Sequence, residues 1–169
     1  MKIAIITGAS SGLGREFARQ LAAEYPEVEQ LWLIARRRER LEEVAASLSR
    51  PAVCLALDLC DPMSFTVLQQ KLLSEKPEVR LLINNAGCGY LGYLGETDTA
   101  VQTRMIDLNL RALTAVTSLT IPYIPRGGRI INVSSIASFC PNPRMTVYSA
   151  TKAFVSHFTV GLNEELRRK

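Results

Sequence analysis

Short apolar runs alternate with helical patterns along the 169 residues of the chain, and this alternation restricts the possible folds more than any other feature. Five runs rich in Ile, Leu and Val lack a period-two pattern, which is typical of strands buried on both faces. They span Lys2–Thr7 and residues 31–35, 53–57, 80–84 and 129–134. Strands that alternate with helices predict an α/β fold, a doubly wound, Rossmann-like parallel sheet with helices on both faces.

The segments between these runs carry helix signals. Apolar residues recur at helical spacing from 41 to 48, which predicts a helix with one apolar face. An Asp-Pro pair at 61–62 is typical of an N-cap followed by the first helical position. A longer helix is predicted from a cap at Thr97 or Asp98 to about residue 121.

Composition and charge are typical of a single globular domain covering residues 1–169. Hydrophobic residues make up 47% of the chain and charged residues 21%, near the average for soluble proteins. The net charge of +4 is modest, and basic residues cluster only at 36–38 and 167–169. A nucleic-acid-binding surface gathers basic residues on one stripe with exposed aromatics, so we expect no nucleic-acid partner.

Targeting and metal-binding patterns are not found in the sequence. The first apolar run is too short for the core of a signal peptide, and no window approaches the length of a membrane span. The cysteines form no Cys-x-x-Cys pair and no histidines cluster, so we predict no metal site. Four cysteines could pair, but reduced, buried thiols in a cytoplasmic protein are the better interpretation. They are Cys54, Cys60, Cys88 and Cys140.

Three glycines, Gly8, Gly12 and Gly14, lie between the first strand and the helix that follows it. A strand-to-helix turn needs one flexible residue at most, and each further glycine costs backbone entropy. In this context the free N–H groups and the dipole of the helix favour an anion, typically a pyrophosphate. Arg15 in the first helical turn opposes the dipole, and a bound phosphate would reverse that effect. A tight turn without a ligand is the alternative.

No carboxylate follows the second strand, where the sequence has Arg36 and Arg37. An Asp or Glu there would bind the ribose 2′-hydroxyl of NAD, whereas arginine suits the 2′-phosphate of NADP. The sequence therefore favours NADP(H) over NAD(H). For any one of the three residues 36–38, a solvent-exposed helix start is the alternative.

Tyr148 and Lys152 lie at positions i and i+4, on one face of a predicted helix. A phenol is a poor acid–base group near neutral pH, but an ammonium about 4 Å away stabilises the phenolate by about 4 kcal/mol. Ser134 and Ser135 end the fifth strand, where ligands of such sheets sit. Asn109 lies within the predicted long helix, a poor position for its propensity. Its amide either bonds a neighbouring carbonyl or supports a water site near the lysine.

With these motifs in this order, the chain resembles the single-domain short-chain dehydrogenases/reductases over essentially all 169 residues. Residues 7–14 are similar to the family's Thr-Gly-x-x-x-Gly-x-Gly turn, and residues 84–87 match its Asn-Asn-Ala-Gly motif. Asp58-Leu59 resembles the pair that contacts the adenine. Asn109, Ser135, Tyr148 and Lys152 match the catalytic tetrad, and the spacing to Tyr148 favours Ser135 over Ser134. The candidate cofactor contacts are Gly8, Ser10, Ser11, Gly12, Leu13, Gly14, Arg36, Arg37, Asp58, Leu59, Asn85, Ala86, Gly87, Tyr148 and Lys152.

The resemblance implies hydride transfer between a nicotinamide and a carbonyl or alcohol carbon. Tyr148 would exchange the proton with the substrate oxygen, and Ser135 would hold that oxygen by a hydrogen bond. Lys152 would also hold the nicotinamide ribose, and Asn109 would hold a water that relays protons. A dinucleotide-binding regulatory or scaffold protein without turnover is the alternative, and a sugar-nucleotide epimerase of the extended branch is disfavoured by the glycine spacing.

The family's pattern also extends beyond these residues. Its members continue into a further strand and a substrate-covering loop, so we expect an incomplete C-terminus without those elements. The apolar segments 88–91 and 139–141 predict an apolar pocket wall and an apolar substrate. Phe154, Phe158 and Leu162 form a helical stripe that suits core packing. Because the family's long helices pair between subunits, a homodimer or homotetramer is also implied. The lone His157 is expected to be a surface or packed residue.

Overall fold

The computed structural model describes residues 1–167, and Arg168 and Lys169 of the predicted basic cluster lie outside that range. The five predicted strands form one parallel sheet in the order β3-β2-β1-β4-β5. After β3 the chain returns to the other side of β1, so the strand order reverses between β1 and β4. The strands are β1 (Lys2–Thr7), β2 (Gln30–Ala35), β3 (Ala52–Ala56), β4 (Glu78–Asn84) and β5 (Arg129–Asn132).

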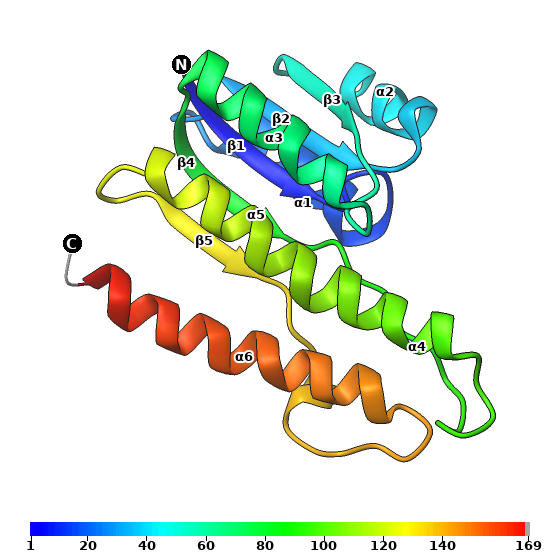
Figure 1. Cartoon of the computed structure of the whole chain (residues 1–169). Helices are drawn as coiled ribbons and strands as arrows, with labels where there is room; N and C mark the ends of the chain where they lie inside the picture. The colour runs from blue at the N-terminus through cyan, green and yellow to red at the C-terminus, as the bar shows by residue number, and fades with distance from the viewer. Residues whose placement is uncertain (168–169) are drawn as a thin grey trace.

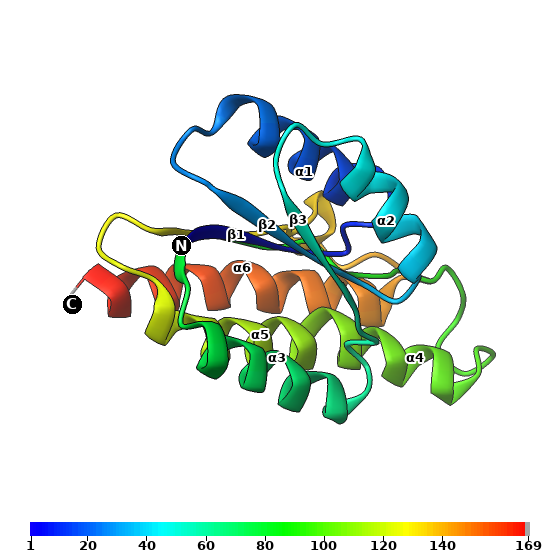
Figure 2. The same ribbon diagram turned by 90° about the horizontal axis from the view of Figure 1, so that it is seen from above.

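Helices cover both faces of the sheet, which confirms the doubly wound fold (Figures 1 and 2). One face carries α1 and α2, and the other carries α3, α5 and α6. Apolar residues of β1 serve both cores: Ala4 and Ile6 pack toward α1 and α2, and Ile3 and Ile5 toward α3 and α5. The long helices are α1 (Gly12–Glu24), α2 (Arg38–Ala46), α3 (Pro62–Glu75), α4 (Thr99–Ile106), α5 (Leu113–Thr120) and α6 (Thr146–Arg167).

Caps fix the starts of two helices. Asp61 Oδ1 accepts a hydrogen bond of 2.9 Å from the N–H of Met63 at the start of α3. Asp98 Oδ1 accepts one of 2.7 Å from the N–H of Ala100, so Asp98 rather than Thr97 caps α4. The helix predicted over residues 41–48 ends earlier, as α2 stops at Ala46.

The long helix predicted to reach residue 121 is interrupted by a π-helical turn, η1 (Asp107–Ala112), between α4 and α5. Such turns widen a helix locally and are frequent at functional sites. The 3₁₀ turns η2 (Ile121–Tyr123) and η3 (Ile136–Ser138) follow α5 and β5. The π-helical turn is the largest departure from the predicted elements.

The predicted fifth strand is too long by two residues, because β5 ends at Asn132. The backbone leaves the sheet there to meet α6. Lys152 Nζ donates to the carbonyl of Val133 at 2.8 Å, and the Ser134 hydroxyl donates to the carbonyl of Lys152 at 3.0 Å. These contacts place the end of β5 against the start of α6.

Within residues 1–167, no helix has the length and apolar character needed to cross a bilayer. No group of three or more His, Cys, Asp or Glu side chains in that range is arranged to hold a metal ion. All four cysteines are free thiols. Cys140 is exposed and the other three are half-buried, so the prediction of buried thiols is wrong for Cys140 and only partly right for the others.

Candidate active site

The carboxyl ends of β1, β2 and β4, with the residues just beyond β3, border one pocket of about 350 Å³. Its position at the reversal of strand order is the place where ligands bind in such sheets. Gly12, Gly14, Tyr148 and Lys152 are not among its lining residues. The predicted cofactor contacts that line it are Gly8, Ser10, Ser11, Leu13, Arg36, Arg37, Asp58, Leu59, Asn85, Ala86 and Gly87.

Four apolar residues that the sequence analysis missed also line this pocket: Ile34, Ala35, Leu57 and Leu108. The first three lie at or just beyond the ends of β2 and β3, so the rule that ligands sit beyond strand ends could have found them. Leu108 belongs to η1. The sequence does not mark the π-helical turn that contains Leu108.

The glycine turn requires glycine for two reasons, backbone conformation and close packing. Gly8 and Gly12 have φ of 68° and 53°, which favours glycine at both positions. A Cβ on Gly14 would lie 2.2 Å from the carbonyl oxygen of Gly8. The expectation that folding needs at most one of the glycines is therefore wrong, because the turn itself requires Gly14.

The N-terminal end of α1 borders the pocket, because Ser11 and Leu13 line it. Ser11 is the N-cap residue with an extended backbone, and its side chain makes no capping hydrogen bond. No acidic side chain lies in the first turn of α1. A helix start without a carboxylate or a hydroxyl cap suits an anionic group, since the first N–H groups lack intrahelical partners.

The Asn-Asn-Ala-Gly motif holds the ends of β1 and β4 together. Asn85 Nδ2 donates to the carbonyls of Thr7 and Gly8 at 3.0 and 3.3 Å. Thr7 Oγ1 accepts from the N–H groups of Asn85 and Ala86, both at 3.0 Å. Asn84 Nδ2 donates to Thr117 Oγ1 and Asn132 Oδ1, both at 2.8 Å. The motif thus fixes the backbone that borders the pocket.

The three arginines after β2 differ in their surroundings. Arg38 is the first residue of α2 and its guanidinium lies 3.8 Å from the Glu42 carboxylate, as expected of a solvent-exposed helix start. Arg36 and Arg37 line the pocket and are exposed. Within residues 1–167 neither of them forms an ion pair. Two guanidinium groups at the mouth are therefore available to an anionic ligand.

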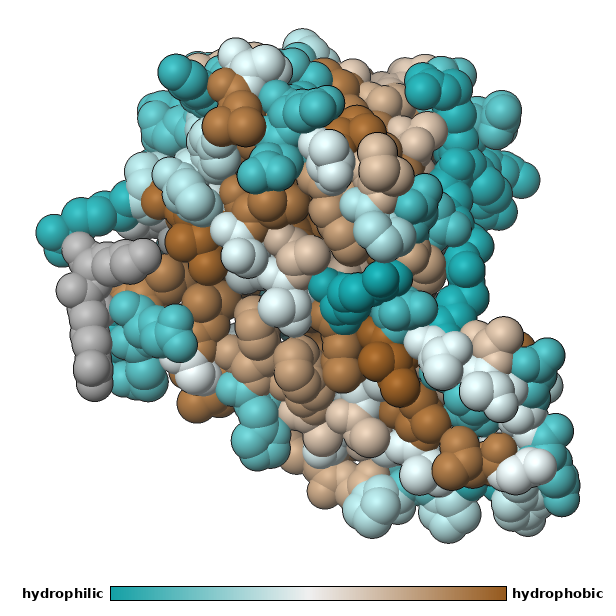
Figure 3. Space-filling view, viewed as in Figure 1, coloured by the Kyte–Doolittle hydropathy of each residue, from teal (hydrophilic) through white to brown (hydrophobic). Residues whose placement is uncertain are grey.

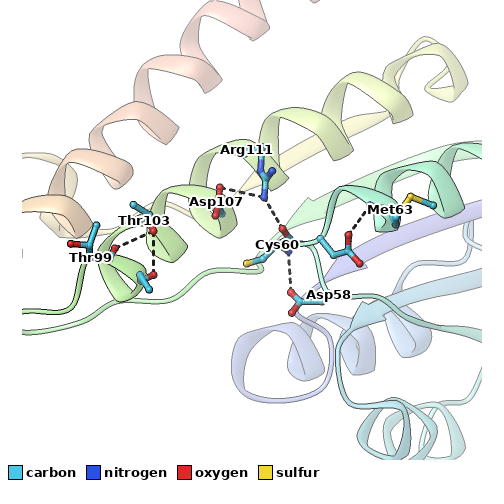
Figure 4. A network of polar contacts seen from close by, with 9 residues as sticks. Asp58, Cys60, Met63, Thr99, Thr103, Asp107 and Arg111 are labelled. Carbon is cyan, nitrogen blue, oxygen red and sulfur yellow. Dashed lines mark hydrogen bonds and ion pairs between the residues drawn. The ribbon is translucent and has the colours of Figure 1, made fainter.

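Asp58 and the loop that carries it connect the pocket with α4 and η1 (Figure 4). Its carboxylate accepts from the N–H of Cys60 at 3.0 Å and from Arg104 Nη2 at 3.2 Å. Partial burial raises the pKa of Asp58, but these two hydrogen bonds together with the positive charges of Arg104 and Arg36 outweigh burial, so the pKa is lowered overall. Arg111, one turn beyond Asp107, donates to the carbonyl of Cys60 at 2.6 Å. The β3–α3 loop is thereby fastened to α4 and η1.

Tyr148 and Lys152 both lie near the start of α6, as their spacing predicts. Lys152 Nζ lies 5.8 Å from the centre of the Tyr148 ring, and Lys152 is only 7% exposed. Burial lowers the pKa of Lys152, and the nearby Cys88 opposes that shift. The ammonium keeps one hydrogen bond within the described residues, to the carbonyl of Val133.

The two serines after β5 have different roles. The Ser134 hydroxyl is used within the protein, since it bonds the carbonyl of Lys152 and lies 2.9 Å from Ser156 Oγ. Ser135 Oγ accepts a hydrogen bond of 3.2 Å from the N–H of Ala137 at the start of η3. No acceptor among residues 1–167 takes its hydroxyl hydrogen. Of the two serines, Ser135 is thus the one whose hydroxyl hydrogen is free within residues 1–167.

Asn109 lies in η1 and is 2% exposed. Its amide holds the backbone of Cys88 from both sides: Oδ1 accepts from the N–H at 2.9 Å, and Nδ2 donates to the carbonyl at 2.8 Å. Nδ2 also donates to Thr151 Oγ1 at 3.0 Å. The predicted bond from the Asn109 amide to a carbonyl is present, but its partner, Cys88, is 21 residues away in the sequence rather than a neighbour.

Gly87 joins the pocket to the tetrad. It lines the pocket, and a Cβ there would lie 3.1 Å from Asn109 Oδ1 and 3.6 Å from Lys152 Nζ. His157 is exposed and its Nδ1 lies 3.0 Å from the carbonyl of Ala153. A parallel sheet with a pocket at its strand switch point and a glycine-rich turn beside it defines an α/β protein of the doubly wound class.

Comparison with known proteins identifies the family within this class of α/β proteins. The family described as short chain dehydrogenase matches residues 2–169. Sulfoacetaldehyde reductase 2 of Chromohalobacter salexigens is 39% identical, over 98% of this chain and 67% of that protein. A short-chain dehydrogenase from Sphingobium yanoikuyae in complex with NADPH has a TM-score of 0.89 at 33% identity, over 99% of this chain and 66% of that one. A metagenomic short-chain oxidoreductase in complex with NADP has a TM-score of 0.90 at 29% identity, over 99% and 77%.

The chain belongs to the short-chain dehydrogenase family, as its motifs predict. It is accordingly an oxidoreductase acting on alcohol or carbonyl groups. The family match spans residues 2–169, which include the glycine turn and all residues that line the pocket.

Proposed function

We propose that this chain interconverts a carbonyl compound and an alcohol, with NADP(H) preferred over NAD(H). The observation that carries the proposal is that Asn109 and Lys152 lie against Gly87, which lines the pocket, and that Lys152 lies near the Tyr148 ring. When bound, the nicotinamide supplies or accepts the hydride. The protein then has to hold the substrate oxygen and exchange one proton with it.

Tyr148 is the proposed acid and base. In reduction its hydroxyl gives a proton to the carbonyl oxygen, and in oxidation its phenolate takes one from the alcohol. Ser135 donates its free hydroxyl hydrogen to the same oxygen and so fixes its position. The Lys152 ammonium, buried near the Tyr148 ring, favours the phenolate by its charge.

Asn109 supports the proposed site by bonding the backbone of Cys88. Both hydrogens of its amide are used, by Cys88 and Thr151, so a water that relays protons to Lys152 would have to bond other groups or the second lone pair of Oδ1. In the proposed proton relay, the Asn109 side chain therefore supports the backbone of Cys88 and does not donate a hydrogen bond to the water.

The residues fit an NADP-type dinucleotide. The start of α1 has no carboxylate and no side-chain cap, and Arg36 and Arg37 line the pocket without ion-pair partners in residues 1–167. Asp58 and Leu59 would take the adenine side. The two solved relatives described above are complexes with NADPH and NADP, which supports the same preference.

Apolar side chains near the tetrad support a small apolar substrate. In the loop after Gly87, Tyr90, Leu91, Tyr93 and Leu94 are each about half exposed, and Phe139 in the loop before α6 is 86% exposed. Exposed apolar groups that flank a reaction site favour an apolar ligand. The substrate class is therefore an apolar ketone or aldehyde and the corresponding alcohol.

A homodimer or homotetramer and a cytoplasmic location complete the proposal. Ile106, Phe154 and Val160 are exposed apolar residues of α4 and α6, and Phe154 stacks on Phe158 with ring centres 5.7 Å apart. Hydrophobic surface is visible where α5 and α6 run (Figure 3). Such surface suits pairing with a second copy. Light scattering of the purified chain tests the assembly.

Thermal denaturation with NADPH and with NADH tests the cofactor assignment. A ligand at a hundred times its Kd stabilises the folded state by about 2.7 kcal/mol, which is a measurable rise in Tm. We expect NADPH to raise the Tm well above NADH at equal concentration. Equal shifts would contradict the preference. No shift with either, in a chain that melts cooperatively, would contradict dinucleotide binding.

A further inference from the structure

Gly89 lies directly against the ring of Tyr148. A Cβ at Gly89 would be 3.0 Å from Cδ2 and 3.1 Å from Cε2 of that ring. Carbon contacts at this distance are shorter than the optimal separation of about 3.5–4.0 Å, so one group would have to move. The φ of Gly89 is not in the left-handed region, so its backbone conformation does not itself require glycine. The tyrosine ring is what excludes a side chain.

The backbone that carries Gly89 is held in place on both sides. Asn109 bonds the N–H and the carbonyl of Cys88, the preceding residue. Farther along the loop, the N–H of Gly92 donates to the carbonyl of Arg144 at 2.8 Å. A side chain at position 89 would therefore displace the Tyr148 ring more readily than the loop, because moving the loop breaks these hydrogen bonds on both sides of it.

The ring has little freedom to move without changing the site. Tyr148 belongs to a regular helix, and the turn that carries it also carries Lys152, whose ammonium is fixed on Val133. A shift of a few tenths of an ångström moves the phenol oxygen from the position in which the proposed function would use it, and such misplacement lowers rates strongly.

From this geometry we infer that Gly89 is a positioning residue: its missing side chain sets where the Tyr148 ring rests and so aligns the phenol for proton transfer. The part of this inference that concerns turnover rests on the proposed function. The contact itself does not, and the experiment separates the two.

The first measurement compares Gly89→Ala with Gly95→Ala in steady-state kinetics. Gly95 lies in the same loop, has no positive φ, and a Cβ there would meet no atom within 4 Å, so it is a matched control. We expect Gly89→Ala to lower kcat about tenfold or more, with NADPH affinity and substrate KM within about twofold of the parent. The control keeps the parental kcat. Equal kcat values in the two variants would overturn the inference.

The second measurement needs no turnover. Thermal denaturation follows Gly89→Ala in the parent and in a Tyr148→Ala background, where no ring remains to clash. We expect the Tm to fall by about 2–4 °C in the parent and not at all in the Tyr148→Ala background. Equal Tm changes in both backgrounds would overturn the contact. If the parent lacks activity while the Tm values depend on the ring as expected, the proposed function fails and the packing role of Gly89 stands.

Discussion

The two halves of the candidate site are built in different ways. The proposed cofactor half is formed by backbone at strand ends, by the glycine turn and by exposed arginines that have no ion-pair partner among residues 1–167. The proposed catalytic half contains buried side chains that bond distant backbone groups, Asn109 on Cys88 and Lys152 on Val133. The comparison teaches that the cofactor half depends on bare backbone and on exposed charge, whereas the catalytic half depends on polar contacts between segments that are distant in the sequence.

The largest expected effect is on the backbone of the cofactor half. In Gly14→Ala the new Cβ would lie 2.2 Å from the Gly8 carbonyl oxygen, so the turn cannot keep its shape. We expect a loss of about 3 kcal/mol or more of unfolding free energy and loss of NADPH binding. Urea denaturation and fluorescence titration measure the two quantities. As a control, Gly161→Ala adds a Cβ with open space in α6. Native stability in Gly14→Ala would contradict the packing role of this glycine.

The next largest effect is on the catalytic half. Asn109→Ala leaves the N–H and the carbonyl of Cys88 without their partners in a buried setting. We expect a loss of about 2–4 kcal/mol in unfolding free energy and a fall in kcat, with NADPH affinity changed much less. The exposed Asn163 on α6 provides the matched control, Asn163→Ala. A cofactor affinity that falls as much as kcat would show that the two halves are not separable.

Exposed arginines give a smaller effect, restricted to one cofactor. We expect Arg36→Gln to weaken NADPH binding about tenfold or more and to leave NADH binding unchanged, because only NADPH carries the 2′-phosphate. Arg38→Gln is the control, since Arg38 pairs with Glu42 instead of lining the pocket. Titration of each variant with both cofactors measures the difference. Parallel weakening of NADH and NADPH binding would contradict the assignment of Arg36 to the phosphate.

The smallest effect is a pH dependence of stability set by Lys152. Burial lowers the pKa of Lys152 below its ordinary value of 10.5, so between the two values the unfolded chain binds more protons than the folded one. Unfolding free energy therefore rises with pH in that window, and Lys152→Met removes this rise. We expect the difference between the Tm of the parent and the Tm of the variant to shift in favour of the parent as the pH is raised toward 10. The unpaired Val133 carbonyl left by Lys152→Met does not titrate, so it cannot produce this trend. A Tm gap independent of pH would contradict the burial of a charged lysine.

Much of the fold could be predicted because β1 and its neighbours are buried on both faces and read as continuous apolar runs. Most residues that line the pocket could also be predicted, since Gly8, Arg36 and their neighbours are local features placed just after strands, whereas Gly12 and Gly14 do not line it. The catalytic half could not be predicted in full. The π-helical turn that brings in Leu108 and orients Asn109 has no local sequence mark, and the pairing of Asn109 with Cys88 joins segments 21 residues apart. Arg104 on Asp58 is likewise a contact between distant segments.

Tyr148→Phe tests the central claim most directly, because it removes the hydroxyl and keeps the ring that Gly89 contacts. The measurement is kcat for reduction of an apolar ketone together with the Kd of NADPH, for parent and variant at the same pH. Loss of a general acid–base group lowers turnover by about 10²–10⁴-fold, and we expect a fall of that size with an unchanged NADPH Kd. A kcat within about twofold of the parent would contradict the assignment of Tyr148 as the proton donor and acceptor.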